Sequence, residues 1–263
     1  MRALYTAATG MAAQELNVQV ISNNIANLRT TGYKRQRPQF QDLLYETLRR
    51  PGAATSDQNT QVPSGIQIGS GVKTVSTARV MSQGTLTPTE KEYDIAIRGE
   101  GFLQVTMPDG RTAYTRDGSL ELDSTGRLTT HDGYLLSPQI TVPNNTISVS
   151  VASDGTMQAT VSGSTAPTTL GQLQLARFVN KAGLDSIGDN LFIETAASGQ
   201  PITGNPNSDG LGNLQQSYLE ESNVNAVTEI SSLIAAQRAY EMNAKVITAT
   251  DQMLSATSQM FRG

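Results

Sequence analysis

Residues 2–28 read RALYTAATGMAAQELNVQVISNNIANL, and the spacing of the apolar residues in this stretch predicts one long helix. Two series of positions recur every seven residues, three positions apart, which is the a/d pattern of a helix that packs along a seam. The first series is Leu4, Met11, Val18 and Ile25, and the second is Ala7, Gln14, Ile21 and Leu28. Thr31-Gly32 ends the helix, because glycine readily adopts the left-handed conformation found at helix C-termini.

The last forty residues show the same pattern. A helix is predicted from Asn223 or Asn225, either of which can act as an N-cap, to Met260. The main seven-residue series is Leu233, Tyr240, Ile247, Leu254 and Phe261, and a more mixed series of Ile230, Gln237, Ala244 and Asp251 lies three positions earlier. We therefore predict that the two terminal helices pair as a coiled coil.

Both helices carry little charge outside these seams. Between Ala3 and Leu28 the only charged residue is Glu15, and Asn and Gln stand where a solvated helix usually carries Lys and Glu. We expect each helix to bury more than one face, with other copies of the same chain as the simplest partners. The alternative is ordinary packing of two helices within one monomer.

Composition excludes several classes of protein. The 263 residues carry a net charge of −4, which argues against a dedicated nucleic-acid-binding domain, and the chain has no cysteine for disulfides or thiolate metal sites. Polar residues such as Thr6, Thr9 and Gln14 interrupt the start, so it does not fit a secretory signal peptide. The chain also lacks an apolar run of about 18 residues, so no membrane-spanning helix is expected.

The middle of the chain has a β pattern. Asp-Gly pairs, typical of hairpin turns, separate short alternating runs between Val75 and Phe192. A stretch rich in Pro, Gly and Ser precedes this region at 46–73, and another follows it at 198–212. The predicted fold class is α+β, in five segments: an N-terminal helix (1–30), an extended connector (31–74), an irregular antiparallel β domain (75–197), a return connector (198–222) and a C-terminal helix (223–263).

Candidates for chemistry are few. The one histidine, His131, lies in a turn. The acidic residues Asp117, Glu121, Asp123 and Asp132 crowd the β region, but Asp117 and Asp132 each precede a turn glycine, where Asp commonly bonds the local backbone. The basic cluster at 34–37 is predicted to be a solvated helix end or a contact to a neighbour's acids. We predict no enzyme activity and no catalytic, cofactor-binding or metal site. A hydrolase using the β-domain carboxylates is the competing interpretation.

Four blocks of sequence stand out along the chain. They are Asn23-Asn24-Ile25-Ala26-Asn27 with Thr30-Thr31-Gly32-Tyr33-Lys34, Gly84-Thr85-Leu86 with Asp94 to Phe102, Tyr114 to Leu120 with Gly126-Arg127-Leu128 and Gly133 to Leu136, and Ser222 to Asn225 with Ala236-Gln237-Arg238-Ala239-Tyr240-Glu241. Together they resemble the family of flagellar basal-body rod and hook proteins. The blocks occur in the family's order and reach from one end of the chain to the other. Asn225 departs from the pattern, which has an acidic residue there.

Within this family, the stretch Pro63 to Gly71 resembles the distal rod members, and a proximal rod subunit is the alternative. The resemblance implies a structural subunit that polymerises into a hollow helical tube, transmits motor torque to the hook and serves as an export channel. It further implies other rod subunits, hook-side proteins, surrounding ring (bushing) proteins and the flagellar type III export apparatus as partners, and a place in the rod that spans the periplasm, reached without a cleaved signal peptide. It implies no cofactor, no nucleic acid and no membrane insertion. A secreted β-rich binding module with helical tethers is the remaining alternative.

Two sets of residues carry these expectations. The predicted assembly residues are Leu4, Met11, Val18, Ile21, Ile25, Leu28, Leu233, Tyr240, Ile247, Leu254 and Phe261. The family-motif residues are Asn24, Asn27, Thr31, Gly32, Tyr33, Gln237, Arg238 and Tyr240.

Overall fold

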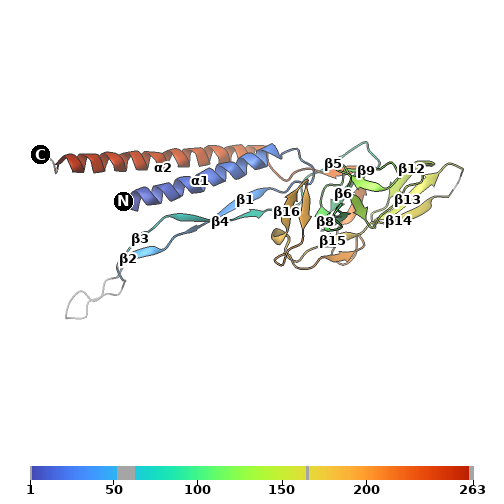
Figure 1. Cartoon of the computed structure of the whole chain (residues 1–263), viewed down its shortest axis with the longest axis horizontal. Helices are drawn as coiled ribbons and strands as arrows, with labels where there is room; N and C mark the ends of the chain where they lie inside the picture. Colours follow the sequence, from blue (N-terminus) through green and yellow to red (C-terminus); the bar gives the residue numbers. More distant parts are fainter. Residues whose placement is uncertain (1, 52–62, 164–165, 261–263) are drawn as a thin grey trace. The chain divides into compact units, whose positions relative to one another are not determined.

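The computed structural model describes residues 2–51, 63–163 and 166–260, and the chain divides into two compact units (Figure 1). The helix unit comprises 1–25, 36–78 and 226–263, and the β unit comprises 26–35 and 79–225. Each unit is therefore built from stretches that are distant in sequence. The predicted Phe261 lies outside the described residues.

The helix unit contains the two terminal helices, which confirms that part of the predicted fold. Helix α1 spans Arg2–Ala26 and α2 spans Ala226–Met260. The helix unit also contains two pairs of strands. Strand β1 (Gln36–Asp42) pairs with β4 (Val72–Arg79), and β2 (Tyr45–Arg49) pairs antiparallel with β3 (Ile66–Gly69). Much of the stretch expected to be an extended connector thus forms two-stranded ladders.

The β unit consists of short strands, and every pairing with a described register is antiparallel. Its central sheet has the order β16-β17-β8-β7-β11-β10-β9, with β15 bridging β7 and β18. Smaller sheets are β12-β13-β14, β6-β19 and β5-β20. The bounds are β5 Leu86–Pro88, β6 Ile95–Arg98, β7 Phe102–Thr106, β8 Thr112–Thr115, β9 Leu120–Leu122, β10 Leu128–Thr130, β11 Leu135–Ser137, β12 Thr146–Val151, β13 Thr156–Val161, β14 Thr168–Gln172, β15 Leu175–Arg177, a 3-10 turn Lys181–Gly183, β16 Asp185–Gly188, β17 Leu191–Ile193, β18 Ile202–Gly204, β19 Asn213–Gln216 and β20 Tyr218–Glu220.

The stretch 198–222, expected to be a return connector, supplies three strands of the β unit. Strand β19 pairs with β6, and β20 pairs with β5, more than a hundred residues away in the sequence. A short strand whose partner is so distant leaves no local pattern in the sequence. This explains why the predicted β domain stops at 197 while the β unit continues to 225.

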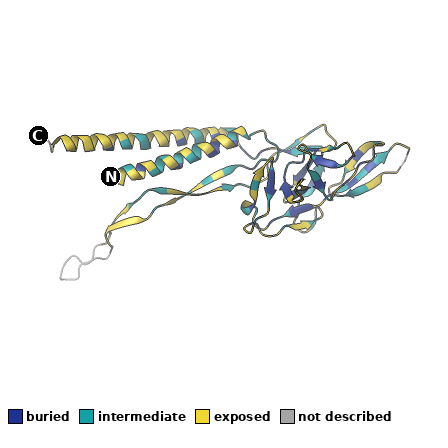
Figure 2. Cartoon of the chain, viewed as in Figure 1, coloured by how far each residue is buried: buried dark blue, intermediate teal, exposed yellow. Residues whose placement is uncertain are grey.

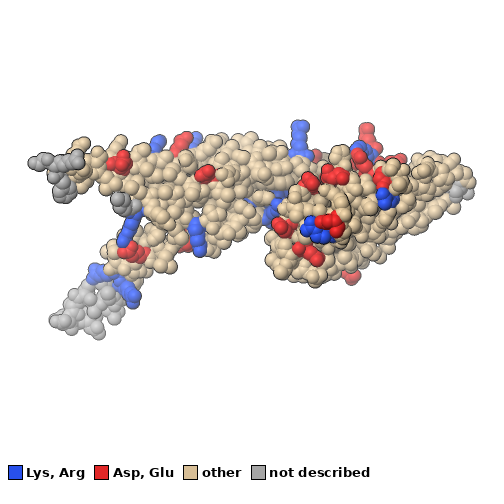
Figure 3. Space-filling model, in the orientation of Figure 1, with Lys and Arg blue, Asp and Glu red and all other residues tan. Residues whose placement is uncertain are grey.

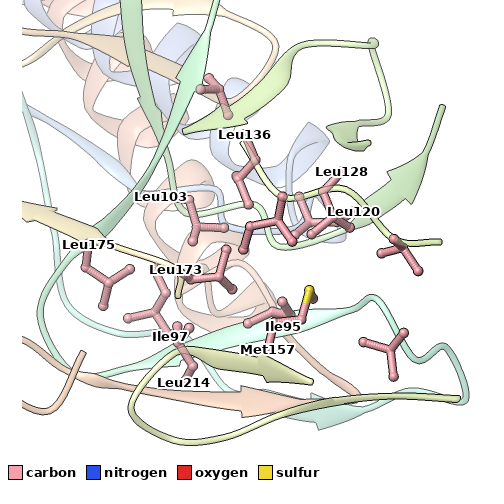
Figure 4. Packing of buried hydrophobic residues seen from close by; sticks show 14 of the residues in the cluster. Ile95, Ile97, Leu103, Leu120, Leu128, Leu136, Met157, Leu173, Leu175 and Leu214 are labelled. Atoms are coloured by element: carbon pink, nitrogen blue, oxygen red, sulfur yellow. The ribbon is translucent and has the colours of Figure 1, made fainter. Parts of the chain in front are cut away.

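The core lies in the β unit. One cluster includes Ile95, Leu103, Leu128 and Met157, all almost fully buried (Figure 4). A second cluster is aromatic, with the ring of Phe178 edge-on to those of Phe102 and Tyr114. Because burial of apolar surface is the main favourable term in folding, these clusters give the β unit its own source of stability.

Candidate assembly interface

Within the helix unit, α1 and α2 lie side by side and run antiparallel (Figure 1). Asn24 of α1 contacts Glu229 of α2, and 14 residues away along each helix a Cβ added to Gly10 would lie 2.9 Å from Nδ2 of Asn243. The same register thus holds over two seven-residue repeats. The absence of a side chain at Gly10 permits the close approach of the helices at this point.

A polar contact fixes one end of this seam. The Nδ2 of the buried Asn24 donates to the backbone oxygen of Gln36 at 2.9 Å and to Oε2 of Glu229 at 3.1 Å, while the Gln36 N–H donates to Asn24 Oδ1 at 2.9 Å. Glu229 lies in the first turn of α2, where a negative charge is favoured by the helix dipole. The family-motif residue Asn24 therefore joins α1, α2 and the start of β1, and a buried polar contact of this kind can specify a single register.

The buried positions of α2 are spaced as predicted but shifted by one residue. They are Glu229, Ala236 and Thr250, with the half-buried Asn243 completing the seven-residue series. This series lies one position before the predicted series that begins at Ile230. The main predicted series flanks it, with Leu233 and Ile247 half-buried and Tyr240 and Leu254 still exposed.

On α1, and at Leu28 just past its end, the predicted assembly residues are partly covered. Ile21 is buried, as is Ala7 of the same series. The other predicted residues are only half-buried, namely Leu4, Met11, Val18, Ile25 and Leu28. A single chain thus uses part of each predicted stripe and leaves the remainder uncovered.

Much of the helix unit is exposed (Figure 2), and it holds most of the exposed large apolar residues of the described chain. Sixteen of the twenty exposed large hydrophobic residues belong to it, and nine of these lie on α2. The α2 members are Val227, Ile230, Ile234, Tyr240, Met242, Val246, Met253, Leu254 and Met260. Few charges interrupt these helices on the face drawn in Figure 3. Exposed apolar surface on this scale is typical of a protein–protein contact.

The segments that leave the β unit toward the helix unit are held together by a buried charge cluster. Oε1 of Glu220 accepts from Lys34 Nζ at 2.5 Å and from the Gly84 N–H at 2.8 Å, while Oε2 accepts from Arg116 at 2.9–3.0 Å. The expectation that Lys34 belongs to a solvated basic cluster was wrong, because its side chain is only 1% exposed. Burial lowers the pKa of Lys34, and the neighbouring carboxylate of Glu220 opposes that effect.

The two family signatures meet beside this cluster. The Asn223 side chain accepts from the Arg35 N–H at 2.7 Å and donates to the backbone oxygen of Val80 at 2.8 Å. Gly32 has φ +68°, donates its N–H to the Glu220 carbonyl at 2.7 Å, and would place a Cβ 2.9 Å from the Arg116 carbonyl carbon. Only glycine suits that conformation and that approach. We call the segments 31–35, 79–84 and 220–225 the neck of the β unit.

The remaining motif residues have less distinctive surroundings. Asn27 accepts a hydrogen bond from the Thr30 hydroxyl at 3.1 Å, and the Thr31 carbonyl accepts from Asn190 at 3.1 Å. Tyr33 is half-buried in the neck, whereas Gln237 and Arg238 are exposed on α2. Glu220 and Arg116 were not among the predicted site residues, because no local sequence pattern distinguishes a buried charge from a solvated one.

The structure places the Asp candidates Asp117, Asp123 and Asp132 in turns or loops, and Glu121 on strand β9. Asp123 accepts from the Thr125 N–H at 2.7 Å and from Arg127, and Asp117 accepts from the Ser119 N–H at 3.0 Å. The backbone hydrogen bond from Arg127 is the main reason that the pKa of Asp123 lies far below its ordinary value. The His131 side chain is 79% exposed. Over the described ranges there is no group of three His, Asp or Glu side chains that could hold a metal ion, and no helix that could cross a membrane.

Comparison with known proteins assigns the chain to a family. Residues 4–34 match the family described as flagella basal body rod protein, residues 96–159 match the flagellar hook protein FlgE/F/G D1 domain, and residues 215–260 match the flagellar basal body rod FlgEFG protein C-terminal region. The matches cover both helices and the first part of the β unit.

Full-length relatives give the same assignment. The flagellar basal-body rod protein FlgG of Caulobacter vibrioides is 53% identical over 260 residues, which cover 99% of each chain. The protein of that name from Borreliella burgdorferi is 46% identical over 100% of this chain and 99% of its own, and the one from Bacillus subtilis is 36% identical over 97% of each. The chain therefore belongs to the FlgG family of flagellar basal-body rod proteins, which are structural proteins and not enzymes.

Proposed function

We propose that this chain is the structural subunit of the flagellar distal rod and that it polymerises through its helix unit into a hollow helical tube. The observation that carries the proposal is the concentration of exposed apolar side chains in the helix unit, sixteen of the twenty among the described residues. Apolar surface of this kind is stabilised when other subunits cover it. A contact between two different patches of the same chain does not close on itself and so extends a filament.

The terminal helices are proposed to form the inner layer of the tube as coiled coils. Their antiparallel contacts at Asn24–Glu229 and Gly10–Asn243, two heptads apart, support this packing. The uncharged polar side chains of α1 suit a channel through which unfolded export substrates pass without strong attraction. Torque would be carried to the hook by many such contacts in parallel, with no chemistry required.

The proposed partners follow from this position in the flagellum. They are further copies of the chain, other rod subunits, hook-side proteins and the rings that surround the rod in the periplasm. We also propose that the flagellar export apparatus delivers the subunit unfolded and without a cleaved signal peptide. In the free subunit the helix unit would be largely disordered, because helices with few internal partners are marginal in water.

Assembly can be tested with two single substitutions on facing helices. Val18→Asp or Ile247→Asp places a charge in the half-buried seam, so each variant should fail to form tubes in electron micrographs and should sediment as a monomer. Ile147→Asp is the matched control, because Ile147 is an exposed apolar residue of the β unit. Tubes of normal abundance from both seam variants would refute this route of assembly.

A further inference from the structure

A small cavity lies in the β unit beside the neck. Its volume is about 100 Å³, and its lining includes Lys34 and Ser82 of the neck, residues 99–102 and Arg116. A water molecule takes about 30 Å³ of liquid, so the cavity has room for about three waters or for one small ion. It is too small for an organic cofactor or a drug-sized ligand.

The buried charges around this cavity do not balance. Lys34 and Arg116 are both buried, and Glu220 is the one carboxylate that forms a salt bridge with either of them in the described part of the chain. Two positive charges and one negative charge leave a net charge of +1. A buried charge without a counter-charge is strongly destabilising, so an anion beside the two cations would stabilise this arrangement.

Each of the two cations keeps one N–H that its contacts within the described residues do not use. Of its three N–H groups, Lys34 donates one to the backbone oxygen of Ser82 at 2.9 Å and one to Glu220 at 2.5 Å. Arg116 donates from Nη1 to the carbonyls of Gly99 and Gly101 at 2.8 and 2.7 Å, while its Nε and Nη2 lie 3.0 and 2.9 Å from Oε2 of Glu220. Because Arg116 has five N–H groups and both cations line the cavity, one donor of each is available to an anion there.

The rim of the cavity does not supply the missing negative charge. Lys181 and Glu100 line it and form a salt bridge with each other, so their charges cancel. Their side chains are 28% and 54% exposed, in contrast to the buried cations. On another side the ring of Phe102 lies 5.9 Å from the guanidinium carbon of Arg116, and this apolar wall strengthens charge interactions in the cavity.

We propose that the cavity binds a small monovalent anion, of which chloride is the simplest, between Nζ of Lys34 and Nη2 of Arg116. One negative charge balances the net charge of +1, and the size of the cavity excludes larger anions. The bound anion would link the neck, through Lys34, to the loop that holds Gly99 and Gly101. This inference goes beyond the proposed function and does not depend on it.

Binding can be measured on the full chain by NMR with ¹⁵N-labelled glycine. Chloride replaces gluconate at constant ionic strength, because gluconate is too large for the cavity. The amides of Gly99 and Gly101, which line the cavity, should shift along a saturating curve. The amide of Gly171, on β14, is the internal control and should not shift.

Two substitutions at the rim should change the affinity in opposite directions. Glu100→Gln removes a competing negative charge and should lower the chloride dissociation constant by about threefold or more, whereas Lys181→Gln should raise it by about the same factor. Both side chains are partly exposed, so neither change should disturb the fold, which circular dichroism checks. Lys91→Gln and Glu121→Gln each break an exposed salt bridge elsewhere in the β unit and are the matched controls, with unchanged affinity.

Saturable shifts at Gly99 and Gly101, with opposite changes of affinity in the two rim variants, establish the site. The absence of a saturable shift in both the natural chain and Glu100→Gln overturns it and means that the cavity holds water only. Equal affinity in all variants also overturns it, since the anion then binds adventitiously elsewhere on the surface. The rod-subunit proposal is unaffected in each case, because none of these measurements reports on assembly.

Discussion

The two units of the chain differ in where their apolar side chains lie. The β unit holds 26 of the 31 buried hydrophobic residues among those described, and the helix unit holds five, namely Ala7, Ala13, Val20, Ile21 and Ala236. Conversely, the helix unit has sixteen of the twenty exposed large apolar residues. The β unit therefore has its own hydrophobic core, whereas the helix unit has the exposed apolar surface that the proposed function assigns to contacts with other subunits.

The units also differ in the size of their buried side chains. Three of the five buried apolar residues of the helix unit are alanines, which bury little area, whereas the β unit buries Leu, Ile, Met and Phe. Since stabilisation scales with buried apolar area, most of the stability of an isolated chain should come from the β unit. The following predictions test this difference, beginning with the largest effect.

Removing the Glu220 carboxylate should unfold or severely destabilise the β unit. Glu220→Ala leaves Lys34 and Arg116 buried without their common anion, and loss of one partner in a buried ion cluster costs about 3–5 kcal/mol. Thermal unfolding of the full chain followed by circular dichroism measures the effect. Glu221→Ala, at the exposed neighbouring position, is the control. A melting temperature unchanged by Glu220→Ala would show that the cluster contributes nothing to stability.

The same truncation should have opposite consequences in the two units. Leu128→Ala in the β core should cost about 2–5 kcal/mol of unfolding free energy because it leaves a cavity. Leu254→Ala on exposed α2 should change the stability of the isolated chain by less than about 0.5 kcal/mol. Assembly should respond in the opposite way. At equal concentrations of folded protein, Leu254→Ala should polymerise less than Leu128→Ala. Urea unfolding and sedimentation measure the two quantities, and equal stability losses for the pair would break the contrast between the units.

Acid should weaken the turns of the β unit in a modest way. The pKa of Asp109, Asp123 and Asp154 is lowered, in each case chiefly by a backbone hydrogen bond within a hairpin turn. A carboxyl whose pKa is lower in the folded than in the unfolded state stabilises the fold above its ordinary value of 3.8, and that contribution is lost as pH falls below it. Urea midpoints at about pH 5 and about pH 3 should therefore differ less for Asp123→Asn than for the natural chain. An identical pH dependence would refute this role of Asp123.

The sequence predicts the parts of this fold that follow a local period. Both terminal helices are read from the seven-residue spacing, and the hairpins are read from Asp-Gly pairs such as Asp109-Gly110 and Asp154-Gly155. Strands β19 and β20 were not predicted, because their partners β6 and β5 lie far away in the chain and no periodicity links them.

The same difference between local patterns and distant pairings applies to the candidate interface. The series of α2 buried within the chain begins at Glu229, one position before the predicted series that begins at Ile230, and Glu229 is the residue that contacts Asn24. The prediction that Lys34 is solvated was wrong because its partner, Glu220, is 186 residues away in the sequence. A local pattern predicts which apolar residues lie on the same face of a helix or strand, whereas pairings between charges that are distant in sequence depend on the completed fold.

The most direct test of the central claim is amide hydrogen exchange of the natural chain, measured by mass spectrometry on the dilute protein and on the assembled polymer. If the helix unit is an interface completed by other copies, peptides from α2 exchange rapidly in dilute protein and become protected in the polymer. Peptides from the β core, such as those of β7 and β8, should be equally protected in both states, since local stability follows buried apolar contact. Protection of α2 in the dilute chain equal to that of the β core would contradict the account.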